Sequence, residues 1–280
     1  MTDLNPSRHP ERPPRGIIWT DLVPMSRWTK AKELMLPLPW LLFSLTLYGT
    51  SLWPLGGIGS FMFFLCALRL NHEAIHGNLG LPRSGDNLVM HVLSALMLGS
   101  NHAFSHCHLL HHKHAMGPGD CEGKCGHMTL PQVLIYGPRF PVDINRAAWA
   151  GSNARGRRRI LIDWSLVIAV ITIALLTGSQ VLLLHVAAMS VAQCLSALFA
   201  VWITHQDTHG SGVAARSQRG VLARLAYLMF YHREHHLFPK VPVSRLPVLA
   251  DRLDRSVAGY ASRRKPVIGW LEPRRFRIEP

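Results

Sequence analysis

The sequence predicts an all-α membrane protein with four transmembrane helices in two hairpins and a cytoplasmic, histidine-rich helical cap. Charge placement is the main reason. The 35 residues from Leu34 to Leu68 and the 43 residues from Trp164 to Gln206 contain no Asp, Glu, Lys or Arg. Composition agrees, because 48% of the 280 residues are hydrophobic and only 16% are charged. These proportions argue against disorder and against a collagen-like repeat.

The first charge-free stretch predicts one helical hairpin. Its first helix is expected over Met35–Leu55 and its second from Ile58 onward. Pro54, Gly56 and Gly57 supply the break between them, since Pro and Gly interrupt helices. The second helix would end near the first pair of spaced histidines.

The second stretch predicts another hairpin. At about 1.5 Å rise per residue it would form roughly 65 Å of helix, about twice the thickness of a bilayer core. Spans are therefore expected over Ile160–Leu176 and Val181–Ile203, with residues 177–180 as the turn. Leu88–Leu98 is apolar but too short to cross, so we expect it to lie in the interface or against the spans, and Met128–Tyr136 likewise.

The net charge of +14 predicts the orientation of these helices. Of the 30 Lys and Arg, 6 lie in residues 1–34, 9 in 71–159 and 14 in 204–280, and neither hairpin turn carries any. By the positive-inside rule both termini and the middle loop are cytoplasmic. The basic residues directly before a span favour membrane anchoring over nucleic-acid binding.

The domain organisation follows from the same pattern. We expect a cytoplasmic N-terminal tail over 1–30, a membrane domain over 31–250 and a basic C-terminal tail over 251–280. The N-terminal region lacks an early apolar segment with a cleavage site, so no signal peptide is predicted. The five cysteines predict no disulfide. A zinc site at Cys121, Cys125 and His127 is disfavoured, because no second pair follows.

Spaced histidines are the main chemical signal. Ten of the 17 histidines fall into two HxxxH pairs and two HxxHH groups, whose i, i+3 and i+4 spacing puts imidazoles on one side of a helix. All ten are expected at the same membrane face. They are His72, His76, His108, His111, His112, His205, His209, His232, His235 and His236. For the histidines without a patterned partner, His9, His91, His127 and His185, ordinary capping or interfacial positions are expected.

Ten imidazoles exceed what one structural zinc needs, so the pattern implies two metals. Nitrogen ligands suit iron, copper, nickel and zinc alike and do not choose among them. The carboxylates beside the groups, Glu73, Asp207 and Glu234, are predicted to accept hydrogen bonds from the outer ring N–H groups. Solvated salt bridges are an equally good interpretation of each.

The order of these groups resembles the integral-membrane fatty acid desaturase superfamily. An HxxxH box follows a hairpin, an HxxHH box lies in the next loop, and a second hairpin precedes a final HxxHH box. The sequences HEAIHG at 72–77 and YHREHHLFP at 231–239, with VP at 241–242 and RLP at 245–247, are similar to bacterial members. The resemblance covers roughly residues 30–250. Its relatives include acyl-lipid desaturases, hydroxylases, and carotenoid ketolases or hydroxylases.

The resemblance implies a non-haem di-iron centre that uses O2 and external electrons to oxidise unactivated C–H bonds. It implies iron ligation by eight of the histidines, namely His72, His76, His108, His111, His112, His232, His235 and His236. His209 matches a further histidine ligand of acyl-CoA desaturases, whereas His205 replaces an asparagine that in those enzymes reaches iron through water. Whether His205 binds iron therefore stays open.

The second box is crowded, because His102, His106 and His114 flank it. His114 in place of His108 is a minor alternative. Asp120 and Glu122, just beyond, would bind a substrate headgroup or cap a loop rich in Gly and Pro, and the loop role is favoured.

The resulting functional prediction is an O2-dependent oxidoreductase of the bacterial inner membrane that desaturates a fatty-acyl or related lipid chain. A hydroxylase or ketolase of a lipid or carotenoid is the alternative, and a metal transporter or metal-binding membrane protein is the non-enzyme alternative. No haem domain or flavin fingerprint is found in the chain, so electrons would come from a ferredoxin or rubredoxin and its reductase. An acidic donor would suit the basic face.

Overall fold

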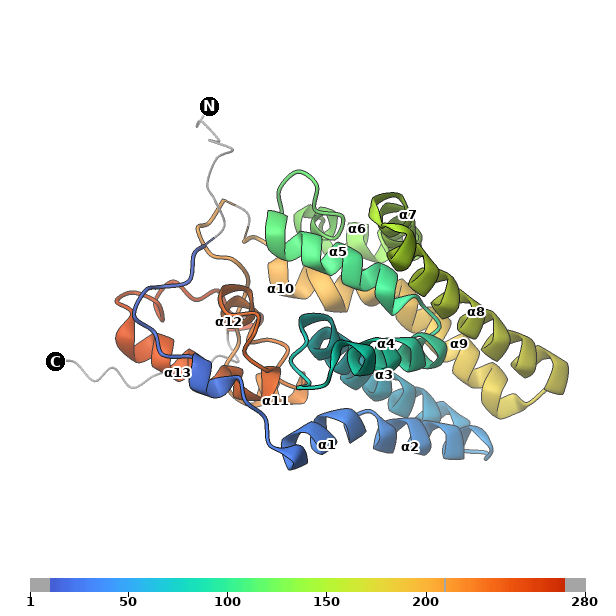
Figure 1. The fold of residues 1–280 in the computed structure, drawn as a ribbon. Coiled ribbons are helices and arrows are strands. Elements are labelled where there is room, and N and C mark those ends of the chain that lie inside the picture. Colours follow the sequence, from blue (N-terminus) through green and yellow to red (C-terminus); the bar gives the residue numbers. More distant parts are fainter. Residues whose placement is uncertain (1–10, 209, 270–280) are drawn as a thin grey trace.

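The computed structural model describes residues 11–208 and 210–269, and all regular elements within these ranges are helical (Figure 1). The predicted all-α class is therefore confirmed. The longer helices are α1 (Arg27–Met35), α2 (Leu38–Tyr48), α3 (Trp53–His76), α4 (Arg83–Met97), α5 (Asn101–His114), α6 (Leu130–Tyr136), α7 (Phe140–Gly151), α8 (Ala154–Thr177), α9 (Gln180–Cys194) and α13 (Leu246–Ser256). The shorter ones are α10 (Ile203–His205), α11 (Val221–Leu225) and α12 (His232–Leu237).

Two helices, α3 and α8, are long and apolar enough to cross a membrane. A third span is possible if α9 and the helical segment Ala197–His205 count as one, although they are bent by 43° at their junction. The bend coincides with a π-helical segment over Ala197–Trp202. Many apolar side chains of α8 face outward, and Leu176 is 83% exposed, as expected of a surface in contact with lipid. The chain is thus a membrane protein with two or three candidate spans within the described residues.

The predicted turn of the second hairpin is confirmed. Gly178 ends α8 with φ +59°, a left-handed conformation that glycine adopts at no steric cost. Ser179 then caps α9 by accepting a hydrogen bond from the backbone N–H of Leu182. The Gln180 side chain donates a hydrogen bond to the backbone oxygen of Tyr48, at 3.1 Å, so the turns of the two hairpins lie at the same end of the molecule.

The break in the first hairpin lies earlier than predicted. The turn occupies residues 49–52, and Pro54 lies in the first turn of α3, where its missing N–H costs no hydrogen bond. Gly56 lies inside α3, and the ring of Tyr48 packs directly against it. A Cβ atom there would lie 2.6 Å from Cδ1 of Tyr48. The glycine therefore serves close packing of α2 on α3. With only 11 residues, α2 does not qualify as a candidate span.

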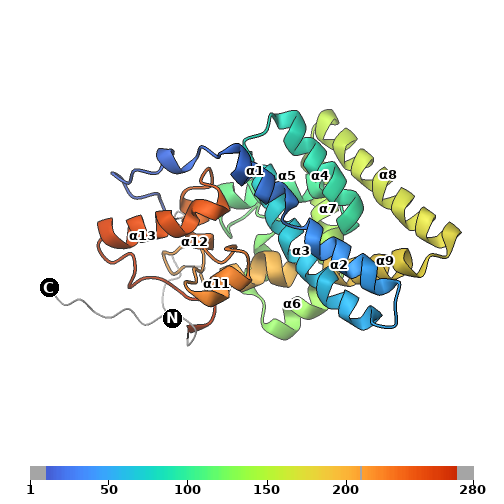
Figure 2. The same cartoon turned by 90° about the horizontal axis from the view of Figure 1, so that it is seen from below.

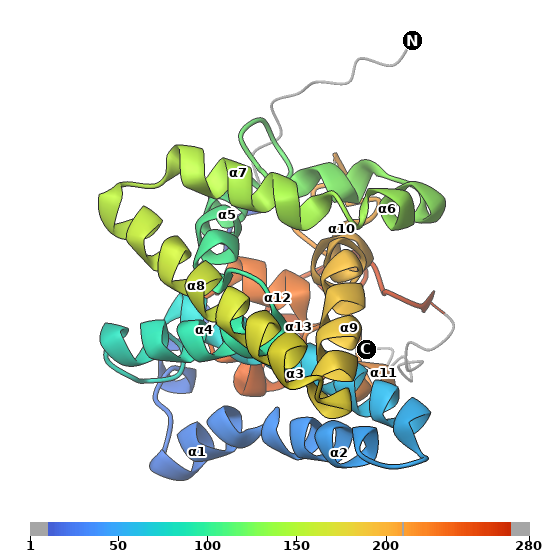
Figure 3. The same cartoon turned by 90° about the vertical axis from the view of Figure 1, so that its right-hand side faces the viewer.

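The remaining helices surround this bundle. Figure 3 shows α6 and α7 lying across one side, with α1 and α2 along the opposite side. The predicted apolar segments at 88–98 and 128–136 are largely helical, as parts of α4 and α6. Figure 2 shows α11, α12 and α13 gathered at the end of the molecule remote from the hairpin turns. We call this group the cap.

Segments from both ends of the described chain pack on the cap. Leu22, Leu249 and Tyr260 belong to one buried apolar cluster. Arg233 of α12 is fully buried and pairs with Glu11, with 2.6 Å between Nη2 and Oε1. Parts of both predicted tails, 1–30 and 251–280, thus pack against the cap, through Glu11 and Leu22 at one end and Tyr260 at the other.

Candidate metal centre

Nine of the ten predicted histidines meet where α3, α5, α10 and α12 converge. The tenth, His209, lies outside the described residues. The nine side chains form two adjoining groups, and the ligand nitrogens within each group lie within 4.8 Å of one another. We call them the five-histidine cluster (His72, His76, His108, His112 and His235) and the four-histidine cluster (His111, His205, His232 and His236).

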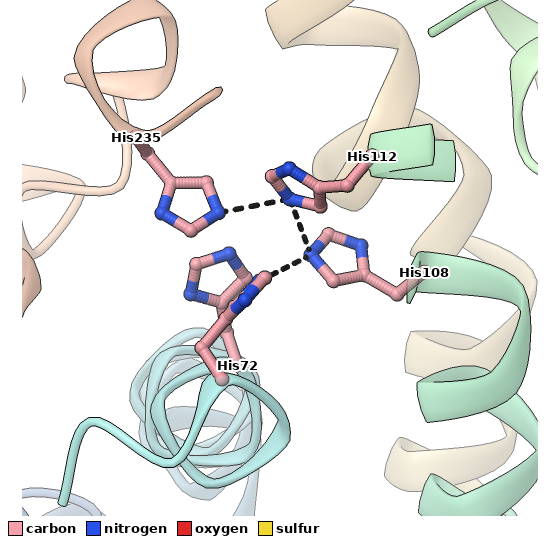
Figure 4. Close-up of side chains that lie close together, drawn as sticks. His72, His108, His112 and His235 are labelled. Atoms are coloured by element: carbon pink, nitrogen blue, oxygen red, sulfur yellow. Dashed lines mark hydrogen bonds between the residues drawn. The ribbon is translucent and has the colours of Figure 1, made fainter. Parts of the chain in front are cut away.

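The five-histidine cluster draws on three helices (Figure 4). His108 Nε2 lies 3.2 Å from Nε2 of His76 and 3.2 Å from Nε2 of His112. His235 Nε2, from the cap, lies 3.0 Å from Nε2 of His112. His72 completes the group, and both of its ring nitrogens are buried with no hydrogen-bond partner.

The four-histidine cluster is centred on His205. Its Nε2 lies 3.0 Å from Nε2 of His111 and 3.0 Å from Nε2 of His232. His236 Nε2 lies 3.2 Å from Nε2 of His232. His205, whose role the sequence left open, therefore lies among the other imidazoles of this cluster.

Helical geometry explains how one box serves both clusters. Residues four apart lie on nearly the same side of a helix, whereas the residue between them is rotated away. His108 and His112 accordingly face the five-histidine cluster, and His111 faces the other. On α12 the assignment is reversed, because His232 and His236 join the four-histidine cluster and His235 crosses to the five-histidine cluster.

The nitrogen geometry fits metal ions. Imidazole–metal bonds of roughly 2.1 Å put neighbouring ligand atoms about 3.0–3.4 Å apart, depending on coordination geometry. The observed Nε2–Nε2 separations of 3.0–3.2 Å fall in this range. Burial lowers the pKa of His108 to about 3 and so keeps that ring neutral, whereas at His111 burial is outweighed by the hydrogen bond with Asp120 and the nearby charges of Glu122 and Asp120, which raise the pKa. Neutral imidazole is the form that binds metal. The residues therefore fit two metal ions, one in each cluster.

Two carboxylates in the loop after α5 contact ligand histidines. Asp120 Oδ2 lies 2.7 Å from Nδ1 of His111, and Glu122 Oε2 lies 3.2 Å from Nδ1 of His108. Burial raises the pKa of Glu122 to about 8. Burial would also raise the pKa of Asp120, but the hydrogen bond from His111 outweighs it and holds that pKa below the usual value. Such contacts orient imidazoles for metal binding.

The predicted loop role of Asp120 also holds. Its Oδ1 accepts hydrogen bonds from the backbone N–H groups of Glu122 and Gly123, at 2.9 and 2.8 Å. The contacts of Asp120 and Glu122 with histidine were not predicted from the sequence. The only available signal was two acidic residues within a short, Gly-rich loop following an HxxHH box.

Three other carboxylates, Glu73, Asp207 and Glu234, were predicted to accept hydrogen bonds from the outer ring N–H groups of the ligand histidines, and within the described residues none of them does so. Glu73 Oε1 is 3.8 Å from Nδ1 of His72, too far for a hydrogen bond, and Oε2 accepts from the backbone N–H of Val243. Asp207 has a side chain 71% exposed and pairs with Arg216, so the salt-bridge interpretation describes it. His205, two residues earlier, is buried, whereas Asp207 adopts a left-handed φ of +58° and its side chain is exposed.

Glu234 likewise supports the cap instead of a ring nitrogen. It accepts hydrogen bonds from Ser217, at 2.6 Å, and from Tyr260, at 3.0 Å, and pairs with Arg219, at 2.9 Å. Glu234 is fully buried, so these contacts hold α12 in place through a side chain that belongs to neither histidine cluster. Ser217, Arg219 and Tyr260 thus fix the part of α12 that carries His235 and His236.

The flanking histidines are outside both clusters. His102 contacts Asp163, and His106 lies beside Ser152. His114 belongs to neither cluster, so the structure gives no support to its replacing His108. Of the histidines expected to be unpatterned, His185 hydrogen-bonds to the backbone oxygen of Leu96, and His9 lies outside the described residues.

An apolar cavity of about 300 Å³ reaches both clusters. His72 and His108 of the five-histidine cluster and His232 of the four-histidine cluster line it. Most of its wall is apolar and comes from α3, the bent helix that ends in α10, and the cap, including Phe61, Leu65, Phe199, Ile203, Met229 and Phe230. A second cavity of about 480 Å³ lies beside it, and Leu68 and Phe104 line both.

The fold and the site define a class: an all-helical membrane protein with two adjoining clusters of metal-ligating histidines. Its family is also clear. The chain belongs to the fatty acid desaturase family, since residues 49–266, more than three quarters of its length, match that family's sequence model. No curated protein matches the chain. Membership of this family implies a lipid desaturase-type oxidoreductase.

Proposed function

We propose that the protein is an O2-dependent, non-haem di-iron oxidoreductase that desaturates a fatty-acyl or related lipid chain. The observation that supports this best is the apolar cavity of about 300 Å³ whose wall includes imidazoles of both histidine clusters. Ligand sites are typically concave and mostly apolar, with a few polar groups at the reacting position. Here those polar groups are His72, His108 and His232.

The iron ligands in this proposal are the two clusters. His72, His76, His108, His112 and His235 would hold one iron, and His111, His205, His232 and His236 the other, with His209 as a further ligand. Bound iron would supply the activation of O2 and the oxidation of a C–H bond. The protein's own contribution is to bury the imidazoles, orient them and exclude water.

Orientation comes from the loop carboxylates. A hydrogen bond from Nδ1 of His111 to Asp120 leaves the lone pair on Nε2 free for the metal, and the contact of His108 with Glu122 acts in the same way. The ring of Phe104 stacks on that of His108, with centroids 5.8 Å apart and an interplanar angle of 11°. This packing limits rotation of the His108 ring, and both side chains line the cavity.

The cavity wall selects the substrate. Phe61, Leu65, Phe199 and Ile203 offer methyl, methylene and aromatic surface, which favours a hydrocarbon chain over a polar substrate. A flexible chain held by such a wall would present one region to the imidazole-lined end. The position of the oxidised carbon would then depend on how deep the chain enters.

Membrane orientation and electron supply complete the proposal. In it, four spans cross a bacterial inner membrane, with both termini and the cap on the cytoplasmic side. Exposed basic residues lie on the cap and on the segment after it, including Arg255 of α13 and Arg263. They would attract an acidic ferredoxin or rubredoxin, which would deliver electrons from its reductase.

Hydroxylation or ketone formation on a lipid or carotenoid would use the same residues, and the product separates these reactions. A metal transporter would instead place ligands near mid-membrane in broken helices. His185, on the candidate third span, is engaged by the backbone oxygen of Leu96 and is outside the metal-ligating groups of the described chain. This arrangement favours an enzyme.

The test is expression in a host of known lipid content together with a competent ferredoxin or rubredoxin and reductase. Mass spectrometry would then follow lipids and added carotenoid. Desaturation predicts products lighter by two hydrogens, whereas hydroxylation predicts the gain of one oxygen. The matched control is His235→Ala. The absence of any product that depends on His235 would contradict the proposal.

A further inference from the structure

A third group of ligand atoms lies outside the two histidine clusters. It joins His91 of α4, His102 of α5 and Asp163 of α8, and its ligand atoms lie within 4.8 Å of one another. We propose that these three residues bind a separate divalent cation of the zinc type. The inference is independent of the oxidoreductase function.

Charge is the first argument. Asp163 has a fully buried side chain, and a buried carboxylate is costly unless a positive charge compensates it. Within the described ranges its ion-pair partners are the two imidazoles, with no lysine or arginine among them. The site therefore lacks a permanent cation beside a buried anion.

The two oxygens of Asp163 share Nδ1 of His102, which lies 3.0 Å from Oδ2, and otherwise have different partners. Oδ2 accepts hydrogen bonds from the hydroxyl of Ser100, at 2.7 Å, and from the backbone N–H of His102, at 3.0 Å. Oδ1 faces Nδ1 of His91, at 2.6 Å, and Nδ1 of His102, at 3.1 Å. Both oxygens thus face the ring nitrogen of His102, and Oδ2 also binds the start of α5 while Oδ1 also faces the ring nitrogen of His91.

The outer nitrogen of His102 is also held. Nε2 lies 3.3 Å from Oδ1 of Asn87. If Nε2 donates its proton to this amide oxygen, neutral His102 directs the lone pair of Nδ1 toward Asp163. Metal-binding histidines usually donate the outer ring N–H to an oxygen in this way. A cation between Nδ1 and the carboxylate would satisfy both lone pairs.

The site is accessible and has a suitable donor set. The side chain of His91 is 18% exposed, so an ion can reach it, and its ring centroid lies 4.3 Å from that of His102. Two imidazoles and one carboxylate are a common ligand set for Zn²⁺, with the fourth position left to water.

Such an ion would join three helices at the start of α5. His102 is six residues before His108, on the helix that also carries His111 and His112. A cation here would fix the N-terminal turn of α5 against α4 and α8. The iron-ligating helix would then be held at both ends, by the third site and by the loop carboxylates.

The experiment uses full-length, iron-loaded protein purified in detergent. Excess Zn²⁺ is added, unbound metal is removed by gel filtration, and iron and zinc per chain are measured by mass spectrometry. We expect His91→Gln and Asp163→Asn to bind one zinc fewer per chain than the wild type, with iron content unchanged. His185→Gln, which alters a buried histidine outside the site, is the matched control and should keep that zinc.

His91→Gln is the decisive variant, because His91 is partly exposed and does not cap a helix, whereas Asp163→Asn weakens the start of α5. Equal zinc content in wild type and His91→Gln would overturn the proposal and would mean that ring protons alone compensate Asp163. Iron is counted in the same samples. Wild-type protein that binds the His91-dependent zinc but holds no iron would contradict the di-iron centre and would leave the zinc site supported.

Discussion

The two HxxHH boxes have the same spacing, but the fold supports them differently. On α5 the rings are supported directly, because Asp120 and Glu122 contact the outer nitrogens of His111 and His108. On α12 the support comes through the residues between the histidines, because Glu234 pairs with Arg219 and Arg233 pairs with Glu11. The outer Nδ1 of His235 is buried without a partner. One motif can therefore be positioned either through its rings or through its helix.

The largest expected effect is loss of a ligand from either box. We expect His76→Ala, His111→Ala and His235→Ala each to lose iron and to lower activity by more than about 100-fold. This exceeds the roughly 10–100-fold loss that is typical when a residue hydrogen-bonded to a metal ligand is replaced. Metal analysis and product formation check this. His127→Ala and His9→Ala should keep both, and equal loss in all five variants would contradict the ligand assignment.

The next effect tests support through the helix. Glu234→Ala removes the carboxylate that pairs with buried Arg219 at 2.9 Å. Breaking a buried ion pair typically costs about 3 kcal/mol or more. We expect a lower midpoint of chemical denaturation and loss of iron from both clusters together, since α12 serves both.

Asp21→Asn is the control for Glu234→Ala, because its ion pair with Arg252 is exposed. It should leave the denaturation midpoint nearly unchanged. A Glu234 variant with normal stability and metal content would show that α12 does not depend on this support.

Support through the rings should give a smaller and more selective effect. Asp120→Asn and Glu122→Gln are expected to weaken metal affinity or activity about 10–100-fold while the fold is kept. Asp120 should matter more, since its contact with His111 is 2.7 Å against 3.2 Å for Glu122 with His108. Iron retention during dialysis against a chelator measures the effect. Asp207→Asn, on an exposed carboxylate, should match the wild type, and similar losses in all three would refute the distinction.

The smallest effect concerns the cavity. Phe104 lines both cavities and stacks on His108, so Phe104→Ala would join the two spaces. We expect a few-fold shift in the position of oxidation or in the preferred chain length, with iron retained, because binding differences of one or two methylenes are worth about 1–3 kcal/mol. Gas chromatography with mass spectrometry of the products checks this, and an unchanged product distribution would remove Phe104 from the substrate path.

Local spacing predicted what depends on local geometry. The i, i+3 and i+4 pattern identified nine histidines that converge, because the spacing on a helix fixes which side chains share a face. Gly178 was recognisable as a turn because nothing in tertiary structure competes for it. By contrast, Gly56 was misinterpreted as a break, since its role depends on Tyr48 from another helix.

Contacts between segments distant in sequence could not be predicted from local spacing. Asp120 and Glu122 reach His111 and His108 only because a loop folds back on α5. Glu234 was assigned to an imidazole, but it meets Arg219 and Tyr260, which approach from other parts of the chain. The group of His91, His102 and Asp163 combines three helices and has no spacing pattern at all.

The central claim is that the histidine boxes form two metal-binding clusters, and that α5 and α12 each supply ligands to both clusters. Anomalous diffraction from crystals of the iron-loaded protein, measured at the iron absorption edge, tests it most directly. The account predicts two iron peaks per chain, one among His72, His76, His108, His112 and His235 and the other among His111, His205, His232 and His236. A single peak, or iron bound away from these imidazoles, would contradict it.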